Sequence, residues 1–236
     1  HLHLPYRLYC ITDDPEDLDA GITPIPMWPA NGLGRSRRLR LFDPSMRAIF
    51  GDRILQLDID CIITADLTPL VDRADPFVIW RAVPEIRYKK NTGELVSNSE
   101  DGAGAYNPSM MLMDTGIMPT LWSDYVNNQA EVEMQARKAG VWTSMYSKGA
   151  GKPTNIRPLP PGDDDQAVLS IYARRLLSPA VWLERDGVYK WGRRGFTDKA
   201  RLPDNARVVF LNSSISQNHP SNPKCEIPKW LEEHWC

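Results

Sequence analysis

Short apolar runs separated by polar, Gly-rich or Pro-rich turns make up most of the chain and predict alternating strands and helices. Apolar runs of about four to eight residues that end at Gly, Pro, Asn or Asp are typical of strands. We expect strands at residues 7–12, 22–27, 53–60, 77–80, 110–113, 188–191 and 208–211, and a hairpin at 86–96.

Apolar residues at helical spacing predict three helical segments and a final helical turn. The first segment has its apolar positions at Leu39, Leu41, Phe42, Met46 and Ile49. It should break near Pro44, because proline disrupts the interior of a helix. Longer helices are expected at 119–138 and 165–176, the second with acidic residues suited to its N-terminus, and a helical turn at 230–235.

Strands alternate with helical segments through the first half of the chain, which is typical of α/β proteins. This order predicts an α/β fold with a mostly parallel central sheet flanked by helices. The sequence shows no linker long enough to separate two domains, so we expect residues 1–236 to form a single domain.

The run LQLDID at residues 55–60 ends in two carboxylates one residue apart. If the strand continues to residue 60, Asp58 and Asp60 point to the same side of it, and Ile59 points to the other. Oxygen ligands of this kind suit Mg²⁺ or Mn²⁺, ions that commonly bind substrate phosphates as well. The alternative is an acidic turn that follows a core strand and binds nothing.

Composition and charge narrow the functional classes. The formal net charge of −2 provides no general field for nucleic acid, although basic residues gather locally at 35–40. The apolar runs are far shorter than the ~20 residues of a membrane span. None of the four cysteines forms a Cys-x-x-Cys pair, which favours a reducing compartment, and we expect the protein to be cytoplasmic.

Several motifs follow one another in an order typical of one enzyme family. They are LDID at 57–60, DLTPL at 66–70, NPSMMLM at 107–113 and the pair Asp165-Gln166. In this order they resemble the GT-A glycosyltransferases, particularly the glycogenin-like and lipopolysaccharide-galactosyltransferase-like groups. The resemblance implies one GT-A-like, Rossmann-related domain. Residues 1–115 would form its nucleotide-sugar and metal half and 116–236 its acceptor half, and the family's first strand is expected to be missing.

The same resemblance implies roles for individual residues. The implied metal ligands for Mn²⁺ or Mg²⁺ are Asp58, Asp60 and His219. The implied substrate-binding residues are Arg38, Asn107 and Lys224, and the implied catalytic-side residues are Asp165 and Gln166. The imidazole would favour Mn²⁺, since Mg²⁺ prefers oxygen ligands. The implied reaction moves a hexose from a nucleotide-diphosphate sugar, with uridine diphosphate as the expected carrier, to a glycan or other hydroxyl acceptor.

Simpler structural roles stay open for several of these residues. Asn107 could form an Asx-type turn before Pro108, Asp165 could cap its helix, and Lys224 could be solvated. Two other functions also stay open: a non-catalytic glycan- or nucleotide-binding relative, and another metal-dependent enzyme that acts on nucleotide phosphates.

Overall fold

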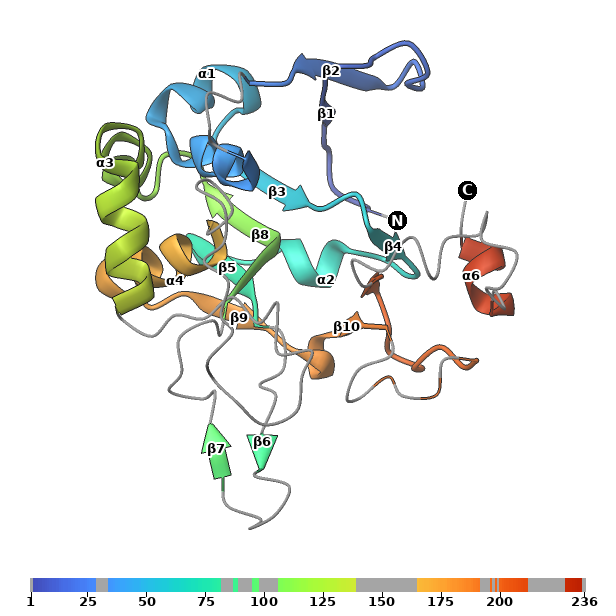
Figure 1. Cartoon of the computed structure of the whole chain (residues 1–236). Helices are drawn as coiled ribbons and strands as arrows, with labels where there is room; N and C mark the ends of the chain where they lie inside the picture. The colour runs from blue at the N-terminus through green and yellow to red at the C-terminus, as the bar shows by residue number, and fades with distance from the viewer. Residues whose placement is uncertain are drawn as a thin grey trace.

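The structure is a computed structural model of the whole chain (Figure 1). It describes residues 2–28, 34–81, 87–88, 95–97, 106–138, 165–191, 196, 198, 200–211 and 228–234. All structural statements below concern these residues.

The largest sheet has four strands in the order β3–β8–β5–β9. Its strands are β3 (Arg53–Leu57), β8 (Asn107–Asp114), β5 (Phe77–Trp80) and β9 (Ala180–Trp182). Both partners of β8 run antiparallel to it, and only β5 and β9 pair in parallel. The prediction of a mostly parallel central sheet is therefore wrong: the protein is mixed α/β with small sheets rich in antiparallel pairs.

The physical reason lies in how β8 enters the sheet. A parallel pair needs a long crossover, usually a helix, whereas an antiparallel pair does not. The described residues between β5 and β8 form only the antiparallel hairpin β6 (Arg87–Tyr88) and β7 (Leu95–Ser97), as expected for residues 86–96. Strand β8 then lies between β3 and β5 and runs antiparallel to both.

Besides the β6–β7 hairpin, two smaller sheets accompany the four-stranded one. In the three-stranded sheet β10 (Val188–Lys190) pairs in parallel with β11 (Val208–Phe210), and β11 pairs antiparallel with β4 (Cys61–Ile63). The other sheet is the parallel pair β1 (Leu8–Thr12) and β2 (Ile22–Pro26), which lies at the top of Figure 1.

Both faces of the four-stranded sheet are covered, which explains why β5 and the Met110–Met113 stretch of β8 are apolar at every position. One face, with Phe77 and Ile79, packs against the helices α3 (Pro119–Lys138) and α4 (Asp165–Leu176). The other, with Val78 and Trp80, packs against the short helix α2 (Thr68–Val71) and the three-stranded sheet. A third core cluster lies on the other face of the three-stranded sheet, which packs against α6 (Lys229–His234).

The predicted bounds of several elements are confirmed and others are wrong. The helices at 119–138 and 165–176 and the strand at 77–80 have the predicted ends, although Asn128 leaves the helical conformation inside α3. The segment with Leu39 is not a regular α-helix: it forms the 3₁₀ segments η1 (Gly34–Phe42) and η2 (Pro44–Met46), then α1 (Arg47–Phe50). No helix within the described ranges has both the length and the apolar character that crossing a membrane requires.

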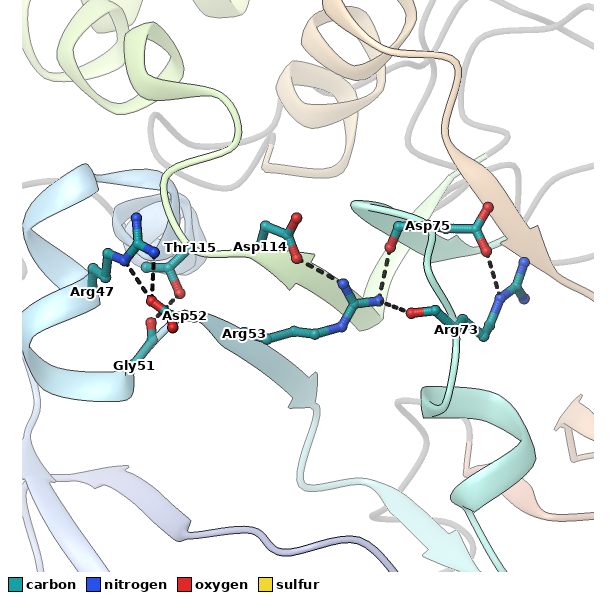
Figure 2. A network of polar contacts seen from close by, with 8 residues as sticks. All are labelled: Arg47, Gly51, Asp52, Arg53, Arg73, Asp75, Asp114 and Thr115. Carbon is teal, nitrogen blue, oxygen red and sulfur yellow. Dashed lines mark hydrogen bonds and ion pairs between the residues drawn. The ribbon is translucent and has the colours of Figure 1, made fainter.

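A polar network holds the starting end of β3 to the finishing end of β8 (Figure 2). Arg53 faces Asp114 directly across the two strands, with Nη1 to Oδ1 at 2.7 Å. Its Nη2 donates to the carbonyls of Arg73 and Asp75, each at 2.8 Å. The side chains of Arg73 and Asp75 also pair with each other, at 2.8 Å.

Candidate functional site

The predicted site lies at the opposite end of the β3–β8 pair. Strands β3 and β5 both run antiparallel to β8, and β9 runs parallel to β5. The C-terminal ends of β3, β5 and β9 therefore lie at the same end of the sheet. The start of β8, with Asn107, lies at this end too. Ligands of open α/β sheets commonly bind outside the carboxyl ends of the strands, so a ligand site is expected at this end of the sheet.

The aspartate pair sits in a turn that links two sheets. Strand β3 ends at Leu57, so the expected strand through residue 60 is wrong, and strand alternation does not set the directions of the two side chains. The backbone N–H of Asp58 donates to the carbonyl of Ser109 on β8, at 2.9 Å. The carbonyl of Asp60 accepts from the N–H of Leu211, just after β11, at 2.7 Å. These two bonds tie the turn to the four-stranded sheet on one side and to the three-stranded sheet on the other.

Arg38 gathers two of the predicted carboxylates and the start of β8. Its Nη1 donates to Asp58 Oδ1 at 2.8 Å and to the carbonyl of Pro108 at 3.1 Å. Its Nε lies 2.7 Å from Asp165 Oδ2, as an ion pair whose angle is outside hydrogen-bond geometry. One guanidinium therefore joins η1, the 58–60 turn, β8 and α4.

Asp165 is the first residue of α4, and its side chain is only 8% exposed. A carboxylate at a helix N-terminus is stabilised by the helix dipole. A buried charge also needs a partner, and Arg38 provides it. Asp165 thus has a structural role at the start of its helix, and its catalytic role stays a prediction.

The charges of the cluster shift one another's ionisation. Burial alone would lower the pKa of Arg38, but Asp165 and Asp58 outweigh it and raise the pKa above its usual value. Burial, followed by the negative charge of Asp58, raises the pKa of Asp60. Lys190 and Arg38 pull the pKa of Asp60 in the opposite direction. Burial and the charge of Asp58 together outweigh the effect of these two cations on the pKa of Asp60.

Two residues near the pair were missed by sequence reasoning. Gln56 donates through Nε2 to Asp58 Oδ1 at 3.1 Å, and Lys190 at the end of β10 acts on the charge of Asp60. Gln56 lies two residues before Asp58, so alternation along the strand could have indicated it. A single Lys at the end of a three-residue strand gives no comparable signal.

Other predicted residues have local roles. The side-chain carbonyl of Asn107 accepts from the N–H of Ser109 at 2.9 Å, which is the Asx-type turn that the sequence left open. Asp66, in the DLTPL motif, accepts from the N–H and hydroxyl of Thr68 at 2.9 and 2.7 Å. These bonds lower the pKa of Asp66, and the motif serves to start α2.

Gln166, the second residue of α4, is partly buried, and its backbone carbonyl accepts from the hydroxyl of Ser170 at 2.7 Å. His219 and Lys224 lie outside the described residues. Their predicted roles as metal ligand and diphosphate contact stay predictions.

The carboxylates of Asp58 and Asp60 fit a metal site that is completed by water and substrate better than a site enclosed by protein ligands. Within the described ranges, no three His, Cys, Asp or Glu side chains lie close enough together to hold a metal ion. Asp58 and Asp60 alone would not enclose Mn²⁺ or Mg²⁺. They suit an ion bound through one or two carboxylates and completed by water and substrate phosphates. The raised pKa of Asp60 fits this reading, since a bound cation would relieve the repulsion from Asp58.

The chain matches no protein-family model, and no curated protein matches it. Support for a function of this site therefore comes from the sequence motifs and from the site geometry alone.

Proposed function

We propose that the chain is a metal-dependent glycosyltransferase that moves a hexose from a nucleotide-diphosphate sugar to a hydroxyl acceptor. The single observation that best supports it is the ion pairing of Arg38 with both Asp58 and Asp165, at 2.8 and 2.7 Å, beside Asp60. Arg38, Asp58 and Asp165 come from three distant parts of the chain and contribute to one cluster. The family resemblance implies a role in sugar-nucleotide chemistry for each of them. The donor sugar, the acceptor and a cytoplasmic location remain predictions from the sequence.

The reaction explains why carboxylates and cations would be needed together. A sugar nucleotide leaves behind a diphosphate that gains negative charge as the glycosidic bond breaks. In this proposal Asp58 and Asp60 hold the divalent ion, which when bound acts as a Lewis acid on the phosphate oxygens. Arg38 would hold Asp58 in place, because its Nη1 donates to one carboxylate oxygen at 2.8 Å.

Asp165 would act chiefly through Arg38. With a side chain only 8% exposed, it has little surface for a sugar, but it holds one edge of the guanidinium. This contact leaves the position of Arg38 insensitive to whether Asp58 is binding metal. We therefore assign Asp165 a positioning role, and the neighbouring Gln166 a sugar contact at the helix start.

The test is a hydrolysis screen of the whole chain against a panel of nucleotide sugars, with Mn²⁺, with Mg²⁺ and with a chelator. Release of nucleoside diphosphate from at least one donor, abolished by the chelator, is the expected result. Activity that is undiminished by chelation would remove the metal from the proposal. Metal-dependent binding of uridine diphosphate without turnover of any donor would instead favour a non-catalytic binding protein.

A further inference from the structure

The 3₁₀ segment η1 has three faces, because a 3₁₀ helix repeats every three residues and side chains at i and i+3 lie above one another. One face consists of Ser36, Leu39 and Phe42, and each of these residues is fully buried. Leu39 and Phe42 belong to the core cluster that also contains residues of α3 and α4. Another face carries Arg38, whose guanidinium lies in the carboxylate cluster. The core therefore holds one face of η1, and Arg38 projects from a different one.

The remaining face of η1, with Arg37 and Arg40, lies against a single aromatic residue. Arg37 Nη1 donates to the backbone carbonyl of Trp28 at 3.3 Å. The guanidinium of Arg40 lies 5.1 Å from the centroid of the Trp28 ring, which is a cation–π distance. Trp28 is partly buried and packs against the same core cluster as Leu39. It thus contacts two arginines that lie on either side of Arg38 in the sequence.

These contacts matter because η1 is long for a 3₁₀ helix. Its hydrogen bonds have poorer geometry than those of an α-helix, and runs beyond about four residues are uncommon, whereas η1 has nine residues. Its orientation therefore depends on side-chain contacts. A rotation of η1 would disturb the ion pairs of Arg38 with Asp58 and Asp165, since a planar guanidinium that joins two carboxylates requires a defined geometry. The buried face opposes such a rotation on one side and Trp28 opposes it on another.

We infer that Trp28 is a positioning residue for Arg38, and through Arg38 for the Asp58 carboxylate of the proposed site. This inference rests on the proposed function and concerns a residue for which the sequence motifs give no role. The indole ring acts through Arg40 and the backbone carbonyl through Arg37. A substitution of the Trp28 side chain therefore removes the ring contact and leaves the carbonyl in place. The competing role is core packing alone, since Trp28 also packs against the core cluster.

The experiment is calorimetric titration of the full chain with uridine diphosphate at a fixed concentration of Mn²⁺. For Trp28→Leu and for Arg40→Gln we expect about fivefold weaker binding, the size of effect that loss of a cation–π contact produces. Arg40→Lys should bind within about twofold of the wild type, because an ammonium can occupy the same face of the ring. Trp28→Leu should have little further effect in a chain that already carries Arg38→Gln, because the ring acts through that guanidinium.

Tyr9→Leu is the matched control, since it removes an aromatic contact that does not involve η1. The Tyr9 ring meets the Phe50 ring edge-on, with centroids 5.1 Å apart. Phe50 packs against the same core cluster as Trp28. Tyr9→Leu should bind uridine diphosphate as the wild type does, and thermal unfolding should show that each variant is folded.

Two results would overturn the inference. One is wild-type affinity in Arg40→Gln, even if Trp28→Leu binds less tightly. The other is an equal loss of affinity when Trp28→Leu is added to the wild type and to Arg38→Gln, which is the result expected of core packing alone. A wild type that binds no uridine diphosphate would overturn the proposed function itself, so the two failures are distinguishable.

Discussion

The two ends of the β3–β8 pair use the same residue types in different ways. At the end in Figure 2, three arginines meet three aspartates, and each charge has a partner: Arg47 with Asp52, Arg53 with Asp114, and Arg73 with Asp75. At the other end, two cations, Arg38 and Lys190, face three carboxylates, Asp58, Asp60 and Asp165.

The two ends also differ in burial, and the side chains at the Arg38 end are the less exposed. Side-chain exposure is 31% and 50% for Arg53 and Asp114, but 23% and 8% for Arg38 and Asp165. The pairs at the Figure 2 end are partly or fully exposed, and each charge is balanced by its partner, so none of them needs a further ion. A partly buried cluster in which, among the described residues, three carboxylates face two cations is costly unless a further cation binds it. The difference is consistent with the proposed ligand site at the Arg38 end, which stays a prediction.

The largest expected effect comes from removing the surplus charge. Asp60→Asn should lower sugar-nucleotide hydrolysis by roughly a hundredfold or more, because several kcal/mol of metal-assisted stabilisation would be lost. The measurement is the steady-state rate with Mn²⁺. Asp204→Asn is the control, since that side chain is 88% exposed and pairs with Arg201. Equal rates for Asp60→Asn and the wild type would exclude Asp60 from the site.

The next effect concerns stability at the buried end. Arg38→Gln leaves Asp165 and Asp58 without their cation and should lower the free energy of unfolding by about 3 kcal/mol. Chemical denaturation measures it. Adding Asp165→Asn to Arg38→Gln should recover part of the loss, because the uncompensated buried charge is then gone. Strictly additive losses in the double variant would show that the two side chains do not interact.

The same substitution at the balanced end should matter less. Arg53→Gln should lower the free energy of unfolding by about 1 kcal/mol, because its partner is half exposed and water can replace the lost contacts. Its hydrolysis rate and its affinity for uridine diphosphate should match those of the wild type. If Arg53→Gln were as damaging as Arg38→Gln, the contrast between the two ends would have no energetic basis.

The smallest effect is a pH dependence at Asp60. Its pKa is raised in the folded protein above the value of 3.8 that applies to the unfolded chain. As the pH rises above 3.8, the unfolded chain loses this proton first, and the folded state loses relative stability until the pH passes the raised pKa. In metal-free buffer, Asp60→Asn should therefore be more stable than the wild type at about pH 7 and similar to it at about pH 3.

Thermal unfolding at the two pH values, with and without Mn²⁺, measures this difference. Mn²⁺ should stabilise the wild type near neutral pH and have little effect on Asp60→Asn, because binding to the folded state alone shifts the unfolding equilibrium. A stability difference between the two proteins that is the same at both pH values would contradict the raised pKa.

Local sequence patterns were sufficient to predict the long helices and one inner strand. The ends of α3 and α4 followed from helical periodicity, Pro119 and Asp165, which act within one or two turns of the chain. Strand β5 followed from a continuous apolar run. The motifs predict Arg38, Asp58, Asp60 and Asp165 as site residues; in the structure Arg38 forms ion pairs with Asp58 and Asp165, and their functional roles stay predictions.

Strand direction and the electrostatic balance of the site depended on contacts between residues far apart in the sequence. The direction of β8 follows from its insertion between β3 and β5, and no local pattern encodes which strands become neighbours. The three-residue strands β4 and β9 were not predicted. Lys190 acquires its relation to Asp60 only because β11 lies between β10 and β4. The aspartate pair could thus be recognised from the chain, whereas the cations that act on it were brought there by folding.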